Sequence, residues 1–369
     1  MMMQRPASIY DLNLDELDLL LKSWDEPTYR ASQIWDGLYR QFWSSIDEFT
    51  SLPKSLRRKL SDYFSLHLTG FGAHPNLLSL QPITKQESSD GETIKTLFSI
   101  AGGFTIEAVL MRYAKRRTLC ISTQAGCAMG CVFCATGQMG FKRQLTSGEI
   151  VEQVLFYARQ LAIENEQVSN IVAMGMGEPF HNYEATMSAI ERLNDPHGYN
   201  LGARRFTIST VGLVPIIRKF TSEHRQINLA ISLHAADDNL RSELLPINHK
   251  YPLDELFVAC QEYVQATHRR LSFEWALIQG VNDTPEQAHL LASRLKGFQR
   301  GSSMLCHVNV IPLNPTKKYV GQASNHQRAL GFQNILEQAG IPCTIRLRRG
   351  IDIQAGCGQL AGQNYSTQK

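Results

Sequence analysis

Three cysteines stand close together in the segment Cys127-Ala-Met-Gly-Cys131-Val-Phe-Cys134. A structural zinc site needs a fourth protein ligand, and no His or Cys follows at the usual short spacing. Three thiolates can instead hold a cubane [4Fe–4S] cluster and leave one iron open. That iron can chelate the amino and carboxylate groups of S-adenosylmethionine (SAM), and an electron from the cluster can cleave the sulfonium to a radical. The spacing favours this centre over a cysteine-rich loop without a cluster.

The cysteine loop follows the first of seven β-rich runs, and helical stretches lie between most of these runs. The runs cover residues 118–123, 169–176, 204–210, 227–235, 271–278, 305–313 and 343–349. Alternating units of this length predict an α/β fold with a parallel sheet, open or closed into a partial barrel. Such sheets place their active site at the carboxyl ends of the strands, where the cysteine loop falls.

Further groups suited to binding SAM stand at the ends of later runs. They are Gly177 and Glu178 in GMGEP, Ser209, the tripeptide Ser232-Leu233-His234, and Asn314 in VIPLNP. Glu178 offers a carboxylate for the ammonium group of SAM, and the hydroxyl and amide groups suit a ribose or a carboxylate. Each residue alone is more often a strand cap than a ligand. Their shared position at one edge favours a binding site.

The sequence before residue 118 predicts two smaller structural parts, a group of helices and a β-hairpin. Leucine and isoleucine spacing predicts helices over 14–21, over 34–42 and from Pro53 through Phe64, with a basic and partly aromatic surface between them. That surface is either a solvated face or an RNA contact. The runs 93–100 and 104–113 flank a turn with two glycines, so they predict a β-hairpin. Glu107 would project from its second strand.

Two further cysteines lie outside the loop. Cys120 is in the first β-rich run, where a buried position is expected. Cys357 lies between two glycines near the carboxyl terminus, which predicts an exposed loop. Three arginines precede it, at positions 346, 348 and 349, and these favour a thiolate at Cys357 or contact with phosphate. Cys260, Cys306 and Cys343 fall in apolar patterns and are expected in the core.

Composition limits the class of protein. The 369 residues are 43% hydrophobic and 19% charged, as in globular proteins, and the net charge is only +3. A nucleic-acid partner must therefore be held by local basic surface. No apolar run approaches the roughly 20 residues that span a bilayer. The first residues lack the pattern of a signal peptide, so we expect a cytoplasmic protein without membrane contact.

Several motifs in order resemble one family. CxxxCxxCATG, GMGEP, SLHA, PIN, VNVIPLNP and the terminal CGQL are similar to those of the RlmN family of dual-specificity radical SAM RNA methyltransferases, of which Cfr is a close relative. The resemblance runs over nearly the whole chain. It implies a partial (β/α)6 radical SAM barrel with an N-terminal helical accessory domain and a β-hairpin extension, and it implies a [4Fe–4S] cluster and SAM as cofactors.

The resemblance implies domains at 1–75 (helical, RNA-binding), 76–114 (hairpin with Glu107), 115–350 (barrel) and 351–369 (carboxyl-terminal segment). It implies methylation of C2 of an adenosine in 23S rRNA at the peptidyl transferase centre, before the ribosome is fully assembled. The tRNA adenosine beside the anticodon is a second candidate substrate. The electron donor would be a flavodoxin-like protein.

The resemblance also assigns roles to the two further thiols. Cys357 matches the cysteine that one SAM methylates and whose methyl a second SAM converts to a radical that attacks the adenine. Cys120 matches the thiol that resolves the protein–RNA adduct through a transient disulfide with Cys357. Glu107 matches the proton acceptor. The residues that match SAM-binding positions are Gly177, Glu178, Ser209, Ser232, Leu233, His234 and Asn314.

One departure and two alternatives accompany this interpretation. The family commonly has an acidic residue where this chain has Gln354, so Cys357 is expected to be slightly more acidic here. A Cfr-type enzyme would methylate C8 with the same cysteines, although the segments 33–42 and 51–57 favour RlmN. A noncatalytic RNA-binding or ribosome assembly factor would keep the cluster for structure alone, a hypothesis that the presence of Cys120, Cys357 and Glu107 disfavours.

Overall fold

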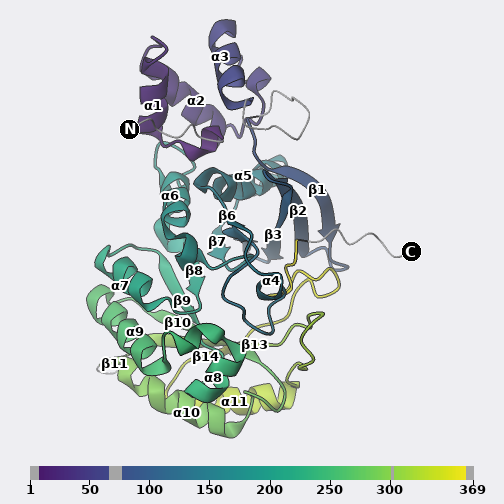
Figure 1. Cartoon of the computed structure of the whole chain (residues 1–369), viewed down its shortest axis with the longest axis vertical. Helices are drawn as coiled ribbons and strands as arrows, with labels where there is room; N and C mark the ends of the chain where they lie inside the picture. Colours follow the sequence, from purple (N-terminus) through teal and green to yellow (C-terminus); the bar gives the residue numbers. More distant parts are fainter. Residues whose placement is uncertain (1–7, 66–76, 301–302, 363–369) are drawn as a thin grey trace.

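The computed structural model describes residues 8–65, 77–300 and 303–362, in which ten strands form one open sheet (Figure 1). Seven of the ten run parallel to one another in one continuous series. In spatial order they are β4 (Arg116–Cys120), β7 (Asn170–Ala173), β8 (Phe206–Thr210), β9 (Asn228–Ser232), β10 (Leu271–Leu277), β13 (Cys306–Pro312) and β14 (Cys343–Ile345). Each of the seven β-rich runs predicted from the sequence overlaps one of these strands, and β4 begins two residues before its run.

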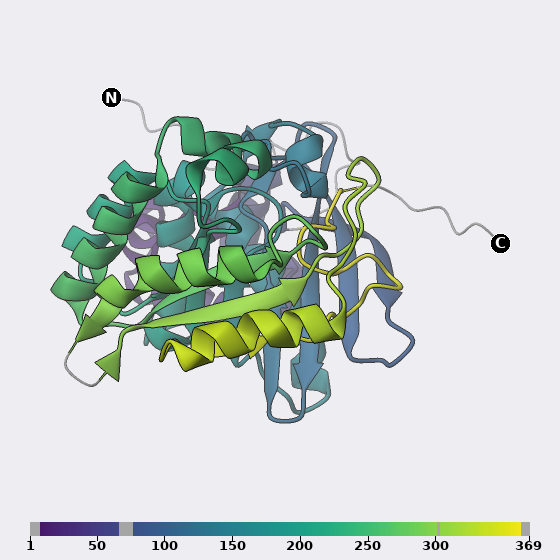
Figure 2. The ribbon, with the colours of Figure 1, turned by 90° about the horizontal axis from the view of Figure 1, so that it is seen from below.

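Helices connect successive parallel strands. They are α5 (Ser147–Ile163), α6 (Tyr183–Asn194), α7 (Val214–Ser222), α8 (Asp238–Leu244), α9 (Leu253–Thr267), α10 (Pro285–Leu295) and α11 (His326–Gln338). Figure 2 shows α10 and α11, in green to yellow, running alongside β13. The series makes six β/α units and ends on β14, so the expected partial (β/α)6 barrel is confirmed with one further parallel strand. The described strands remain open between β1 and β14.

The strands of the barrel are apolar because both faces of a parallel sheet are covered. In β10, Phe273 and Trp275 are fully buried on one face, and the first of these rings packs on α9 through Phe257. Shorter elements complete the barrel: β5 (Gln124–Ala125), β6 (Arg143–Gln144), α4 (Ala135–Gln138), β11 (Gln299–Arg300) and β12 (Ser303–Met304). Short 3-10 turns cover 9–11, 46–48, 179–182, 203–205, 246–249 and 296–298.

Three antiparallel strands extend the sheet beyond β4: β1 (Gln81–Glu87), β2 (Thr93–Ile100) and β3 (Phe104–Tyr113). The predicted β2–β3 hairpin is confirmed. The sequence did not reveal β1, because its residues are polar, it contains Pro82, and its register shifts between Pro82 and Thr84. Such features are found at the edge of a sheet, where a strand needs no second partner.

The N-terminal helices are α1 (Leu14–Lys22), α2 (Tyr29–Tyr39) and α3 (Lys54–Ser65), at the top of Figure 1. All three were predicted. The helix predicted over 34–42 was too long, however, because α2 ends at Tyr39 and Phe42 has a left-handed backbone with φ of 59°. The predicted domain boundary between 75 and 76 lies outside the described residues. The proposed division of the chain remains a prediction.

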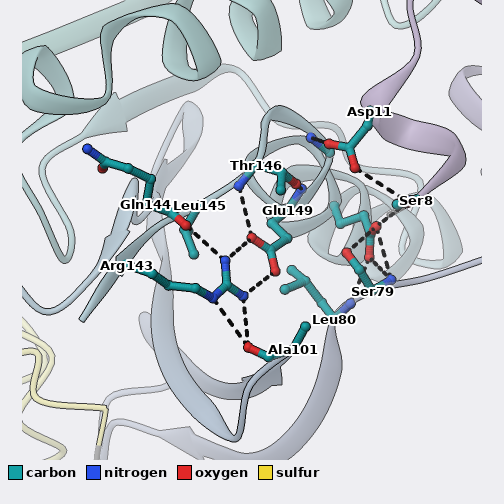
Figure 3. A network of polar contacts seen from close by, with 12 residues as sticks. Ser8, Asp11, Ser79, Leu80, Ala101, Arg143, Gln144, Leu145, Thr146 and Glu149 are labelled. Atoms are coloured by element: carbon teal, nitrogen blue, oxygen red, sulfur yellow. Dashed lines mark hydrogen bonds and ion pairs between the residues drawn. The ribbon is translucent and has the colours of Figure 1, made fainter. Parts of the chain in front are cut away.

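The first turns of α5 hold the N-terminal region against the barrel (Figure 3). A capping box begins this helix, with Thr146 and Glu149 as its members. The carboxylate of Asp11 accepts a hydrogen bond from the backbone N–H of Gly148 at 2.8 Å. One turn later, the buried carboxylate of Glu152 accepts from the side chains of Ser8 at 2.8 Å and Ser79 at 2.7 Å, and from the Leu80 N–H at 2.9 Å.

The same helix end also holds the β2–β3 turn. Glu149 pairs with Arg143 at 2.6 Å, and the Arg143 guanidinium donates to the carbonyl of Ala101 in that turn (Figure 3). The hairpin is therefore fixed to the barrel at its tip as well as through the β3–β4 ladder. Within the described residues, no helix is long and apolar enough to cross a membrane.

Candidate active site

One pocket lies at the carboxyl ends of the parallel strands and brings together the cysteine loop and most predicted SAM-binding residues. Those that line it are Cys127, Cys131, Cys134, Gly177, Glu178, Ser209, Ser232, His234, Asn314 and Cys357. Leu233 does not line this pocket: its side chain is fully buried in the core. Only its backbone remains for a polar contact, and its carbonyl already accepts from Arg241.

The cysteine loop is held in a tight backbone path. Gly126 has φ of 71°, and a Cβ atom there would lie 1.9 Å from the carbonyl oxygen of Gly140. That close approach is needed because the N–H of Cys127 donates to the same carbonyl at 3.2 Å. Glycine is the residue that fits both conditions. The N–H of Ala135, just after the third cysteine, donates to the Gly358 carbonyl at 2.7 Å.

The three loop thiols suit an iron–sulfur cluster electrostatically. Burial raises the pKa of the Cys127 thiol to about 12. Burial also raises the pKa of Cys131, and negative charge on Cys134 and Cys127 raises it further. Three thiolates would therefore repel one another in this dry loop. Bound iron would offset this repulsion, because cysteines coordinate metal as thiolates and the positive charge of the iron stabilises them.

Glu178 is fixed at the end of β7. Its carboxylate accepts from the N–H of Phe180 at 3.0 Å and from the N–H of Val211 at 2.9 Å, and burial raises its pKa to about 7. The preceding Gly177 has φ of 105°, and a Cβ atom there would lie 2.6 Å from Gln124. The glycine thus permits the close packing that aims this carboxylate at the pocket. A buried carboxylate of this kind suits an ammonium group.

The next two strand ends meet directly. The hydroxyls of Ser209 and Ser232 lie 3.1 Å apart. His234 has a left-handed backbone, and its Nδ1 accepts from the N–H of Ala276 at 2.9 Å. Burial lowers its pKa to about 3, so the ring is neutral and carries its proton on Nε2. This row therefore offers hydroxyl and imidazole N–H groups to a polar ligand.

Asn314 links the pocket to the carboxyl-terminal segment. Its Nδ2 donates to the Cys357 carbonyl at 3.0 Å. Its Oδ1 is buried and has no hydrogen-bond partner among the described residues. A buried acceptor without a partner is rare in folded proteins, so a ligand that donates to it would be favoured. The residues around this pocket therefore fit SAM.

Cys357 lines a second cavity as well, and Cys120 lines that cavity with it. Burial raises the pKa of the Cys120 thiol, and negative charge on Cys357 raises it further. The two cysteines border the same cavity, and the transient disulfide between them remains a prediction. Cys120 is at the end of β4, and Cys357 is 237 positions later.

Cys357 is exposed, as predicted, but its thiol is not made acidic by the arginines. Arg346 lowers the pKa of this thiol, while burial of the sulfur among protein atoms and the charge of Glu274 raise it more. The expectation that the arginines favour a thiolate was therefore wrong. Glu274, which the sequence analysis missed, is buried in β10, lines the cysteine-loop pocket and lies 4.0 Å from Arg346.

Glu107 is buried and ion-paired. Its Oε1 lies 3.0 Å from Nζ of Lys95, and both side chains are at most 2% exposed. Its Oε2 accepts from the N–H groups of Ala361 at 2.7 Å and Gly362 at 3.0 Å. Nζ of Lys95 also donates to the Gln354 carbonyl at 3.3 Å.

The ion pair therefore binds the backbone on both sides of Cys357. Figure 1 shows this segment, in yellow, beside the hairpin. Sequence analysis missed Lys95, although a lysine in the apolar run 93–100 was a visible signal. In the hairpin register Leu97 lies opposite Glu107, so Lys95 is its diagonal neighbour on the same face.

Comparison with known proteins gives two regional matches. The profile of the ribosomal RNA large subunit methyltransferase N-terminal domain matches residues 7–66. The profile of the radical SAM superfamily matches residues 121–292. The first region holds α1, α2 and α3, and the second holds the cysteine loop and most of the barrel.

Whole-chain relatives are also similar. A probable dual-specificity RNA methyltransferase RlmN from Chloroflexus aurantiacus is 48% identical, over 96% of this chain and 93% of its own. Dual-specificity RNA methyltransferase RlmN 1 from Myxococcus xanthus is 49% identical, over 96% and 94%. The crystal structure of a radical SAM methyltransferase from Sphaerobacter thermophilus matches with a TM-score of 0.90 and 48% identity, over 97% of this chain and all of that chain.

Proposed function

This chain belongs to the RlmN family of radical SAM RNA methyltransferases, and we propose that it methylates C2 of an adenosine in 23S rRNA at the peptidyl transferase centre. We propose the tRNA adenosine beside the anticodon as a second substrate. As a radical SAM enzyme it uses a [4Fe–4S] cluster and SAM. The observation that carries the proposal is the position of Cys357, which lines both the cysteine-loop pocket and the cavity of Cys120.

In this proposal Cys127, Cys131 and Cys134 hold the cluster. Gly177, Glu178, Ser209, Ser232, His234 and Asn314 hold SAM, with Leu233 able to contribute only through its backbone. When bound, the cluster and SAM supply an electrophilic methyl group and a radical that abstracts hydrogen. The neutral His234 and the buried Glu178 orient the cosubstrate without adding a second cation to the site.

Cys357 carries the methyl group. Its sulfur forms a bond to the methyl carbon of SAM while the sulfonium–methyl bond breaks, and the thiol proton leaves. Loss of one hydrogen atom from the S-methyl group leaves a methylene radical on Cys357. C2 of adenine lies between two nitrogens and is electron-poor, so it does not attack a sulfonium methyl itself. It does accept a carbon radical, and the product is a covalent bridge from Cys357 to the RNA.

Cys120 releases the product. The C2 proton leaves the adduct to Glu107, and one electron leaves it, which the oxidised [4Fe–4S] cluster would accept when bound. The Cys120 thiolate then attacks the Cys357 sulfur. The sulfur–carbon bond breaks, a disulfide forms, and the carbon takes up a proton to become the methyl group. The high pKa of Cys120 keeps it protonated until a base removes its proton. A reductant must then restore both thiols before the next turnover.

Glu107 remains our proposed proton acceptor. Both carboxylate oxygens already receive N–H donors, and each oxygen of a carboxylate can accept more than one hydrogen bond. The buried ammonium group of Lys95 lies 3.0 Å from Oε1 and fixes the position of this carboxylate. Lys95 therefore supports the role of Glu107 as a positioning residue.

The partners and location follow from the proposed reaction. Free 23S rRNA exposes the target adenosine, so we propose that the enzyme acts before ribosome assembly is complete, in the cytoplasm, with a flavodoxin-like electron donor. The Cfr-type alternative predicts the same adduct at C8. A noncatalytic factor would bind RNA without consuming SAM.

Mass spectrometry of digested RNA separates these functions. The reconstituted holoenzyme, supplied with SAM, a reductant and protein-free 23S rRNA, should yield 2-methyladenosine at a single position. Treatment with the Cys357→Ala variant is the control and should yield none. A product methylated at C8 would show a Cfr-type enzyme. Intact SAM and unmodified RNA in the presence of a competent reductant would support the noncatalytic factor.

A further inference from the structure

A fully buried arginine lies behind the wall of the cysteine-loop pocket. Arg241 is in α8, and it is 0% exposed. Its Nη2 donates to the Val211 carbonyl at 2.7 Å and to the Ser232 carbonyl at 3.4 Å. Its Nε donates to the Leu233 carbonyl at 3.1 Å. Val211 and Ser232 line the pocket, whereas Arg241 does not. The guanidinium group therefore binds the pocket wall from behind.

The hydrogen-bond acceptors of Arg241 are uncharged. Besides the three carbonyls, Oδ1 of Asn248 accepts from its Nη1 at 2.9 Å. Among the described residues, no carboxylate forms an ion pair with this arginine. The carboxylate of Asp238 lies beyond Asn248, whose Nδ2 donates to its Oδ1 at 2.9 Å. Burial lowers the pKa of Arg241 to about 10, and negative charge on Cys131 is the largest influence that raises it, so the group stays charged near pH 7.

A buried cation is stable only if hydrogen bonds or negative charge offset the water that it loses. Hydrogen bonds to neutral oxygens hold the guanidinium group of Arg241, but they leave its positive charge in place. The pocket on the other side of the wall is where negative charge is expected. Three thiolates on a cubane cluster leave a net negative charge, and the electron that the cluster takes up before SAM cleavage adds to it.

The helix that carries Arg241 also packs on the cysteine loop. The N–H of Val132, between the second and third cysteines, donates at 3.1 Å to the carbonyl of Leu244, the last residue of α8. Cys131 packs with Leu244 and Leu245 in one apolar cluster. Arg241 comes about one helical turn before Leu244. The same short helix therefore fixes both the buried charge and the loop that would hold the cluster.

We propose that Arg241 raises the reduction potential of the cluster, because its fixed positive charge stabilises the reduced, more negative form. It is a positioning residue that acts on the cluster through its charge from behind the pocket wall. Arginine suits this place because it stays charged when buried and its planar fork reaches several carbonyls at once. This inference rests on the proposed assignment of Cys127, Cys131 and Cys134 as cluster ligands. The electron comes from the reductant that the proposed function already requires.

The test measures the reduction potential of the cluster rather than turnover. Reconstituted holoenzyme without SAM is poised anaerobically at a series of potentials, and electron paramagnetic resonance gives the reduced fraction. Arg241→Gln removes the charge, whereas Arg241→Lys keeps a cation. The matched control is Arg192→Gln, because Arg192 is also buried and donates to two backbone carbonyls, those of Tyr10 and Asp11 in the N-terminal region. Iron content and unfolding temperature are measured for each protein.

A second variant shifts the potential in the opposite direction and keeps the hydrogen bonds. Asp238→Asn removes a negative charge that is linked to Arg241 through Asn248. Its Oδ1 can still accept from Nδ2 of Asn248 and from the Leu253 N–H, as Asp238 does. The cluster should therefore become easier to reduce. This variant decides the question if Arg241→Gln does not assemble its cluster.

At an effective dielectric constant of about 20, a unit charge roughly 10 Å from a redox centre changes its equilibrium by at least about tenfold. At a fixed applied potential, the ratio of reduced to oxidised cluster should therefore fall about tenfold in Arg241→Gln, a midpoint shift of about 59 mV. The ratio should stay near the wild-type value in Arg241→Lys and in Arg192→Gln, and it should rise in Asp238→Asn.

Three results would overturn the proposal: an unchanged ratio in iron-loaded Arg241→Gln, an equal fall in Arg241→Lys or in the Arg192→Gln control, or no rise in Asp238→Asn. A cluster that responds as expected, in an enzyme that never methylates RNA, would refute the proposed function and leave the role of Arg241 standing.

Discussion

Replacement of Lys95 by methionine tests how the protein holds its methyl-carrying cysteine. The side chain keeps its length, but Glu107 loses the cation 3.0 Å away while both groups stay buried. Removal of one partner from a buried ion pair costs roughly 3 to 5 kcal/mol. That corresponds to about two to four powers of ten in the equilibrium that docks the segment or folds the chain.

The loss should fall first on the segment around Cys357. Lys95 also donates to the Gln354 carbonyl, and Glu107 holds the N–H groups of Ala361 and Gly362. Hydrogen exchange should therefore accelerate at Ala361 and Gly362 in the variant, while amides in β10 keep their wild-type protection. Urea unfolding of the same protein gives the global part of the cost.

The double variant Lys95→Met/Glu107→Gln separates anchoring from proton transfer. It removes both charges and keeps an amide oxygen for the two backbone N–H donors, so slow exchange and most of the stability should return. If Glu107 also accepts a proton, the double variant should still fail to methylate RNA. A Lys95→Met protein within about 1 kcal/mol of wild type, with unchanged exchange at Ala361, would refute the account of this pair.

Three further outcomes are expected. The Gly126→Ala variant should bind little iron per chain, because the added Cβ atom would lie 1.9 Å from the Gly140 carbonyl oxygen. The control is Gly140→Ala. Gly140 has the same φ of 71°, but its added Cβ atom would meet open space, so this variant should keep most of its iron. Glu152 has a pKa raised from 4.5 to about 7 by burial, so the folded state holds a proton that the unfolded chain releases between those values. The free energy of unfolding should fall as pH rises from about 4.5 to 7, by at most about 3 kcal/mol, and urea titrations at pH 5 and 8 should show a smaller fall for Glu152→Gln. Cys357→Ala should form no RNA adduct on denaturing gels, and a slow-migrating adduct in that variant would contradict the role of Cys357.

Patterns of neighbouring residues predicted the parallel strands, the start of α5 and the place of the cysteine loop. The seven parallel strands are apolar runs because both of their faces are buried, and α5 begins where Thr146 and Glu149 form a capping box. The cysteine loop was placed correctly because strand, loop and helix follow in order. β1 escaped detection because an edge strand needs neither apolar residues nor alternation.

The rest depended on contacts between distant segments. Glu107 and Ala361 are 254 positions apart, and no periodicity announces their hydrogen bond. The pKa of Cys357 depends on burial of its sulfur and on Glu274 as well as on Arg346, so counting the nearby arginines alone gave the wrong net direction. Leu233 matched a binding motif, yet its side chain is buried in the core, while Ser232 and His234 on either side of it line the pocket.

The Cys120→Ala variant gives the most direct test of the central claim, that Cys357 carries carbon from SAM to an adenine of the RNA. Without the resolving thiol, the covalent species should accumulate when the variant holoenzyme is incubated with SAM, reductant and protein-free 23S rRNA. Tandem mass spectrometry of the digested adduct should find one methylene bridge between the Cys357 sulfur and C2 of a single adenine. A bridge to another cysteine, attachment at C8, or no adduct at all would contradict the account.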